Sequence, residues 1–324
     1  MNNQHSIFFL KNGTSYQGVL TKDIFEQFFI EQVGSDRYIY DGDSVLYEID
    51  AQIADIRRKF IEHIFIDINS FYNELPTVPI FISEAGLSSS SSISKDDLIK
   101  LIEETQCGIP NLYKHLYLED VYFILSSIQN LVIGMNYNFI QYFKSLALVE
   151  EPKKIDNGTY MISGEIANII QSTLGSYFVK AHSILDLLTK IGFELECKEF
   201  DLSSYPKLKC SKILFGDKRK LKINNSKNTV FFRDELINTI ESLRNEIIHN
   251  GSWEMNSKVF MKIENFHTRE RFVYFPDMQN GNWTKFKNRY HFFSSENTVN
   301  NILPAMHIEF LNRISATLLA FITI

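Results

Sequence analysis

The sequence predicts a mainly α-helical protein. Apolar residues recur at steps of three and four over several long segments, which is the pattern of helices that bury one face. One shorter region, Lys258–Phe275, is instead rich in β-branched and aromatic residues, and it predicts a β-hairpin with His267–Glu270 between its strands. Apolar residues make up 44% of the 324 residues, so a full core can form without disulfides or structural metal.

The N-terminal region, residues 1–150, is expected to be helical after an irregular start of about 40 residues that contains one short helix, Asp23–Glu31. Apolar periodicity predicts two long helices, Ser44–Glu74 and Leu118–Leu148. A shorter helix between them begins at Ser94, a good N-cap residue with acidic residues in the turn that follows. No motif in this region indicates a function.

A polar segment, Glu150–Gly158, contains a proline and an Asn-Gly pair and is typical of a domain boundary. It separates the N-terminal region from a second predicted domain, residues 151–324. We expect helices in this domain over Glu165–Phe193, Val230–Asn250 and Glu296–Ile324, with the hairpin between the last two.

Composition excludes several classes of protein. Three widely spaced cysteines fit neither a disulfide framework nor a zinc site, and they favour a reducing compartment. The chain starts without a recognisable signal peptide, and no apolar run reaches the ~18–20 residues of a membrane span. Phosphate-binding glycine motifs are missing too. We therefore expect a cytoplasmic protein that uses no metal or cofactor and does not bind a membrane.

The charge of the chain is unevenly distributed. The net charge is −6, yet eight basic residues and one acid lie between Ser203 and Asn228. Such a zone fits a polyanion such as RNA, and a solvated lysine-rich loop fits equally well. Basic and aromatic residues also alternate over Lys285–His291, as in surfaces that bind single strands or in half-buried strands. The candidates for RNA contact are Lys218, Arg219, Lys220, Lys222, Lys285, Lys287 and Arg289.

Polar residues of catalytic type end the predicted helix Val230–Asn250. Asn245 and His249 lie one turn apart, and the long side chain of Arg244 can swing toward them. Imidazole exchanges protons, and guanidinium stabilises charge on a phosphate. These groups suit metal-independent RNA cleavage, in which the 2′-OH loses a proton and the 5′-oxygen gains one. Ordinary capping of a helix C-terminus is the alternative interpretation.

Two further features bear on this hypothesis. One histidine cannot easily serve as both acid and base, so the chemistry favours a homodimer in which two sites face each other. On the preceding helix, His182 and Asp186 lie one turn apart. Asp186 either orients Arg244 as a supporting group or belongs to a simple surface pair.

The segment from Arg244 to His249 resembles the motif of the HEPN superfamily, in which an arginine, a polar residue that is often asparagine, and a histidine end a helix. The preceding segment His182–Gly192 also looks like HEPN, and the resemblance covers about Gly158 to the C-terminus. It implies a helical bundle that dimerises through its motif helices. In this family the bundle is commonly a metal-independent endoribonuclease of toxin–antitoxin or anti-phage systems.

By the same resemblance, Arg244 and His249 would carry catalysis and Asn245 would assist. An antitoxin or another regulatory protein is then an expected partner, beside RNA. Some members of the superfamily are catalytically silent, so a module that binds RNA or a protein is the alternative. The inserted hairpin and the long connection before the motif helix depart from the smallest members, and both bear on dimer geometry and substrate access.

Overall fold

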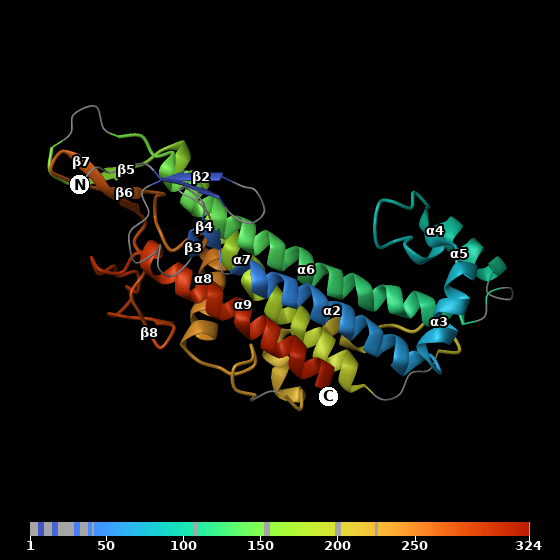
Figure 1. Ribbon diagram of the computed structural model, residues 1–324. Helices are drawn as coiled ribbons and strands as arrows, with labels where there is room; N and C mark the ends of the chain where they lie inside the picture. Colours follow the sequence, from blue (N-terminus) through green and yellow to red (C-terminus); the bar gives the residue numbers. More distant parts are fainter. Residues whose placement is uncertain are drawn as a thin grey trace. The chain divides into compact units, whose positions relative to one another are not determined.

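The structure is a computed structural model, and it describes residues 6–9, 15–18, 29–32, 38–40, 42–105, 109, 111–151, 156–197, 202–223 and 226–323. With 62% helix and 10% strand, the protein is mainly α-helical, which confirms the predicted class (Figure 1).

The elements follow one another along the chain in Figure 1. The α-helices are α2 (Gly42–Ile64), α3 (Ile68–Glu74), α4 (Ile80–Ser83), α5 (Lys95–Thr105), α6 (Leu112–Ala147), α7 (Glu165–Glu196), α8 (Glu235–Asn250) and α9 (Val299–Thr323). Among the described residues, the 3-10 helices are η1 (Leu75–Thr77), η2 (Lys209–Lys212) and η3 (Phe215–Lys220). The strands are β1 (Ser6–Phe9), β2 (Ser15–Gly18), β3 (Phe29–Gln32), β4 (Tyr38–Tyr40), β5 (Gly158–Ile162), β6 (Val259–Glu264), β7 (His267–Phe272), β8 (Met278–Gln279) and β9 (Asn282–Trp283).

The chain forms two compact units, each assembled from three separate segments. Unit 1 contains residues 1–48, 131–183 and 225–316, and unit 2 contains residues 49–130, 184–224 and 317–324. Helices α2, α6, α7 and α9 each contribute residues to both units. The division into an N-terminal region and a HEPN-like domain near residue 150 stays a prediction.

Two predicted helices of the N-terminal region differ from the structure in more than their bounds. The segment Ser44–Glu74 is not continuous, because the chain leaves the helix after Ile64 and Asp67 caps a new one. The Asp67 carboxylate accepts a hydrogen bond from the Ser70 amide at 2.8 Å, which satisfies one of the free donors of α3. The short helix predicted over Asp23–Glu31 is wrong at its end, where β3 begins, and its earlier residues lie outside the described ones.

The predicted β-hairpin is present in unit 1, but its turn lies elsewhere. Strands β6 and β7 pair antiparallel, and Glu264 lies opposite His267. The turn consists of Asn265 and Phe266, whose φ angles are 55° and 60°, so His267–Glu270 belongs to the second strand. Two positive φ angles are typical of a tight two-residue hairpin turn, and asparagine tolerates them well. Strand β5 pairs with β6 and completes a three-stranded sheet.

A buried histidine lies in the core of unit 1. His307 of α9 is 0% exposed and stacks on Phe139 with a ring separation of 4.3 Å. Its Nδ1 lies 3.2 Å from the Tyr177 hydroxyl, and its Nε2 lies 3.1 Å from Oδ1 of Asn136. An amide oxygen is an acceptor, so Nε2 carries the proton and Nδ1 accepts from the tyrosine. Burial lowers the pKa of His307 to about 3.

This histidine makes stability depend on pH. The unfolded chain takes up a proton at His307 below about pH 6.5, whereas the folded chain does not until about pH 3. Stability is therefore expected to fall as the pH drops between these values, by up to about 1.4 kcal/mol per pH unit from this group. The measurement is urea unfolding across this range for the wild type and for His307→Gln, which cannot titrate. Equal slopes for the two proteins would contradict the assignment.

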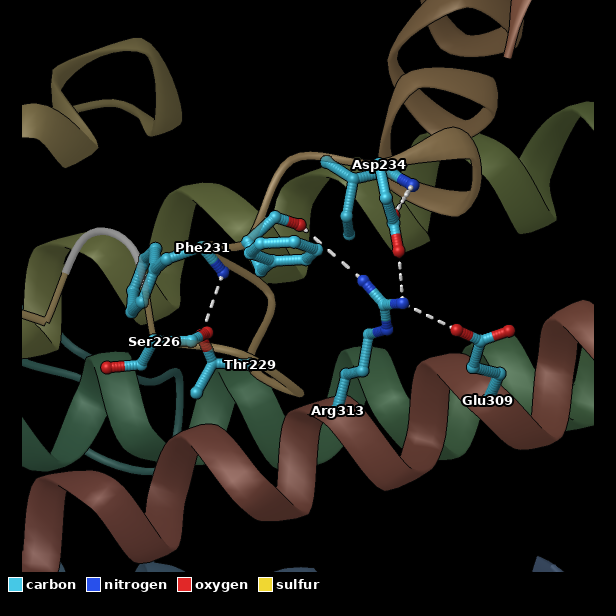
Figure 2. A network of polar contacts seen from close by, with 8 residues as sticks. Ser226, Thr229, Phe231, Asp234, Glu309 and Arg313 are labelled. Carbon is cyan, nitrogen blue, oxygen red and sulfur yellow. Dashed lines mark hydrogen bonds and ion pairs between the residues drawn. The ribbon is translucent and has the colours of Figure 1, made fainter. Parts of the chain in front are cut away.

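An arginine of α9 fixes the start of α8 in unit 1. Asp234 is the N-cap of α8 and accepts a hydrogen bond from the Ile237 amide at 3.3 Å. Arg313 forms an ion pair with Asp234 and another with Glu309 at 2.5 Å, as Figure 2 shows. The Arg313 side chain is 11% exposed, so the arginine of these ion pairs is largely shielded from water. Helix α8 is thus attached to α9 at its N-terminal end.

The basic segment predicted as a long connection is folded within unit 2. It contains η2 and η3, and its chain is anchored by buried Cys210 and Phe215. Glu194 of α7 is 1% exposed and accepts hydrogen bonds from the Tyr117 hydroxyl at 2.7 Å and from the Cys210 amide at 2.9 Å. The exposed lysines of this segment, which include Lys220 and Lys222, therefore project from a supported surface of unit 2.

Helices α6 and α9 are long and apolar enough to cross a membrane by length and composition alone. Within the most apolar stretch of each, 44% and 56% of the residues are buried inside the protein. Core helices of folded domains have the same character. The expectation that the chain does not bind a membrane stays a prediction.

Candidate functional site at the end of helix α8

The buried face of α8 includes one charged residue. Leu236, Ile240 and Leu243 are buried as predicted, but Glu246 takes the next buried position and Ile247 is only partly covered. Glu246 is 6% exposed. A buried carboxylate needs polar partners, because a buried charge without a partner destabilises the fold by several kcal/mol. Sequence reasoning had placed Ile247 at this position of the core.

The C-terminal end of α8 is held firmly in unit 1. Gly251 ends the helix with a φ of 86°, as predicted, and its amide donates to the carbonyl of Ile247. Two residues later, Trp253 is 1% exposed and contacts the ring of Phe178 edge-on at 5.8 Å. The Gln171 amide of α7 donates to the Ser252 hydroxyl at 2.8 Å. The residues that close α8 are therefore fixed against α7.

The motif side chains lie on one side of this helix end. The Arg244 guanidinium donates to Oδ1 of Asn245 at 2.9 Å, so the long side chain turns toward the asparagine, as the sequence had indicated. Asn245 and His249 are exposed and about 40° apart around the helix axis at 100° per residue. No hydrogen bond or ion pair joins the His249 side chain to another described residue. A guanidinium, an amide and an imidazole are therefore open to a ligand at this end of α8.

A second histidine reaches the same helix end from the segment that follows β9. The Nε2 atom of His291 lies 3.1 Å from Oε1 of Glu246. The same oxygen accepts from the Asn250 amide at 3.0 Å and from the Tyr290 hydroxyl at 3.4 Å. The negative charge of Glu246 and burial together raise the pKa of the Tyr290 hydroxyl. Glu246 thus has the partners that its depth requires.

The β8–β9 hairpin positions this segment on α8. Its turn packs against the helix, where Asn238 donates to the carbonyl of Asn280 at 3.0 Å and Ser242 donates to that of Gly281 at 2.8 Å. The Trp283 ring of β9 contacts the ring of His291, with 5.1 Å between centroids. The hairpin turn therefore packs on the first half of α8, and the chain after β9 runs from there to the helix end that carries the motif.

A basic turn, Lys285–Arg289, lies between the hairpin and His291. Phe286 and Arg289 exchange backbone hydrogen bonds of 2.8 and 3.0 Å, and Lys287 has a φ of 54°. The predicted half-buried strand is therefore a tight turn. The three candidates for RNA contact in this turn are exposed, namely Lys285, Lys287 and Arg289. They belong to the same short segment as His291.

The remaining candidates for RNA contact lie in unit 2. The Lys218 ammonium lies 4.0 Å from the centroid of the Phe215 ring and is shielded from water. Lys220 forms an ion pair with Asp217 at 2.8 Å, which lowers the pKa of that carboxyl, and half of its own side chain stays exposed. The other two side chains are exposed, those of Arg219 and Lys222. One of the four cations in this group is thus shielded from water and another is held in an ion pair.

The supporting pair predicted on α7 is divided between the two units. His182 belongs to unit 1 and is partly buried, whereas Asp186 belongs to unit 2. The Asp186 carboxylate accepts a hydrogen bond from the Phe215 amide at 2.8 Å, so it helps to hold the basic segment. Its pairing with Arg244 stays a prediction.

Sequence reasoning missed Glu246 and underestimated His291. The available signal was the spacing, because Glu246 lies three positions after Leu243 and so shares its buried helix face. A carboxylate on a buried face must have a hydrogen-bond partner. In the part of the chain that the structure describes, no three histidine, cysteine or acidic side chains gather as a metal site would require. Comparisons of the chain with protein-family models, with curated proteins and with solved structures gave no match.

Proposed function

We propose that this protein is a metal-independent endoribonuclease of the HEPN type. The observation that carries the proposal is the end of α8, where the Arg244 guanidinium turns to Asn245 beside an exposed His249. Guanidinium stabilises charge on the phosphorus oxygens, and imidazole transfers a proton at a ribose or leaving-group oxygen. The exposed cations of the basic turn supply attraction for the phosphate backbone.

The wider role follows from the same resemblance. The chain would act in the cytoplasm as a toxin or anti-phage defence effector, with an antitoxin or regulatory protein as a partner. Two copies would pair through their α8 helices, which would bring two motifs to one RNA strand. The fold around the motif would be a HEPN-like helical bundle with the β6–β7 hairpin as an insertion.

The test is cleavage of labelled RNA by the purified full chain in excess EDTA. We expect cleavage that leaves 2′,3′-cyclic phosphate ends, and Arg244→Ala should reduce its rate about 100-fold, as the loss of one charge-stabilising donor does. The matched control is Arg269→Ala, because Arg269 is an exposed arginine of unit 1 and lies on β7. A requirement for a divalent metal, or equal rates in the two variants, would overturn the proposal.

A catalytically silent module that binds RNA or a protein is the second candidate. The hydrogen bond from Arg244 to Asn245 favours it, because that contact engages one donor of the guanidinium within the helix itself. Binding of RNA without cleavage of any RNA tested would establish this alternative in place of the nuclease.

A further inference from the structure

Four side chains form a continuous arc around the end of α8. At 100° per residue, His249 lies about 40° beyond Asn245 around the helix axis, and Glu246 lies about 60° beyond His249. The Arg244 guanidinium turns to Asn245 at one end of the arc, and His291 contacts Glu246 at the other. Glu246 and His249 are three positions apart, so they are neighbours on the helix surface. The imidazole of His291 therefore contacts a helix residue that neighbours His249 within a single chain.

The contact with Glu246 determines the state of the His291 ring. A buried carboxylate is an acceptor, so Nε2 of His291 carries a hydrogen and the unprotonated nitrogen of the neutral ring is Nδ1. The carboxylate also stabilises the imidazolium that forms when Nδ1 takes up a proton. The rings of Trp283 and Tyr290 pack against the imidazole, which leaves 33% of the side chain exposed. An imidazole that is held by a carboxylate and partly open to solvent has the features of a general base.

We propose that His291 is the general base of the RNA-cleaving site and that Glu246 is its positioning residue. This inference rests on the proposed function. Nδ1 of His291 takes the proton of the 2′-OH, and the 2′-oxygen forms a bond to phosphorus. The bond from phosphorus to the 5′-oxygen breaks, and His249 in its imidazolium form gives its proton to that oxygen. The products are a 2′,3′-cyclic phosphate and a 5′-OH, and water returns both rings to their starting states.

Two substrates distinguish the role of the general base from that of the general acid. One is a dinucleotide with an ordinary 5′-oxygen leaving group, and the other is uridine 3′-(p-nitrophenyl phosphate), whose leaving group departs without protonation. We expect His291→Gln to slow both reactions about 100-fold, because both need a base. His249→Ala should slow the dinucleotide reaction strongly and the nitrophenyl reaction less than about threefold.

Further variants test the position of the ring. Glutamine can still donate to Glu246, so His291→Gln is expected to keep the fold. His291→Ala should regain nitrophenyl ester cleavage on addition of free imidazole, which a purely structural histidine would not show. Glu246→Gln should slow both reactions about tenfold. The control is Asn288→Ala, since Asn288 is an exposed residue of the basic turn Lys285–Arg289, close to His291 in the sequence.

The outcomes separate the two proposals. Failure of the wild type to cleave either substrate would overturn the proposed function and this inference with it. Cleavage that needs Arg244 and His249 but proceeds at the wild-type rate in His291→Gln would overturn this inference alone. That result would leave the two-chain site, in which paired His249 residues share the proton transfers, as the mechanism.

Discussion

Replacement of His249 with alanine is expected to slow RNA cleavage about 1000-fold and to leave the thermal stability of the protein almost unchanged. Proton transfer by a positioned side chain contributes on the order of 100- to 10,000-fold to such reactions, and in the proposed mechanism His249 is the acid. The side chain is exposed and makes no hydrogen bond or ion pair with another described residue, so its loss removes no internal contact that the structure describes.

The measurement combines the single-turnover rate on labelled RNA with the melting temperature of each variant. His267→Ala is the matched control, because His267 is an exposed histidine of unit 1 and lies on β7. A loss of activity in both variants would point to a general effect of histidine removal. Full activity in His249→Ala would remove the motif from the chemistry.

Replacement of Gly281 with alanine is expected to lower the free energy of unfolding by about 2–4 kcal/mol. Gly281 has a φ of 75°, which disfavours any side chain. A Cβ atom there would lie 2.6 Å from Cβ of Asn238 and 2.6 Å from the Thr239 amide, and closer still to the carbonyl oxygen of Glu235. Two of these three neighbours belong to the backbone of α8, which cannot move aside without loss of helical hydrogen bonds.

The same change should also reduce RNA cleavage, because the hairpin that carries Gly281 positions the segment with His291. Thermal denaturation and the cleavage rate measure the two effects separately. Gly216→Ala is the control, since a Cβ atom at Gly216 would meet nothing within 4 Å. Equal melting temperatures for the two glycine variants would show that the hairpin does not pack on α8 as described.

Helix positions could be predicted because apolar periodicity is a local property of the chain. The helix that carries the motif was predicted to end at Asn250, and it does, since Asn-Gly is a strong local stop signal. Its predicted start lies five residues too early, because the helix begins after the N-cap Asp234 and apolar periodicity alone does not locate a cap. The break at Asp67 was missed for the same reason.

The site could be predicted only where it lies on one helix. Arg244, Asn245 and His249 belong to a single turn and a half, and helical geometry alone brings them together. His291 lies 45 residues beyond Glu246 in the sequence, and their contact depends on where the β8–β9 hairpin packs. Such long-range pairing has no local signal. The one indication was Glu246 itself, a charged residue at a buried position of α8, which needs a polar partner from another segment.

The chain has two tryptophans, and they occupy contrasting places in unit 1. Trp253 is enclosed at 1% exposure, whereas Trp283 is only partly covered and touches the ring of His291. Indole emission depends on the surroundings of the ring, so the two contributions to the intrinsic fluorescence are distinguishable by wavelength. The proposed binding of RNA at the end of α8 can thus be tested optically, through a reporter that the protein already carries and without an attached dye.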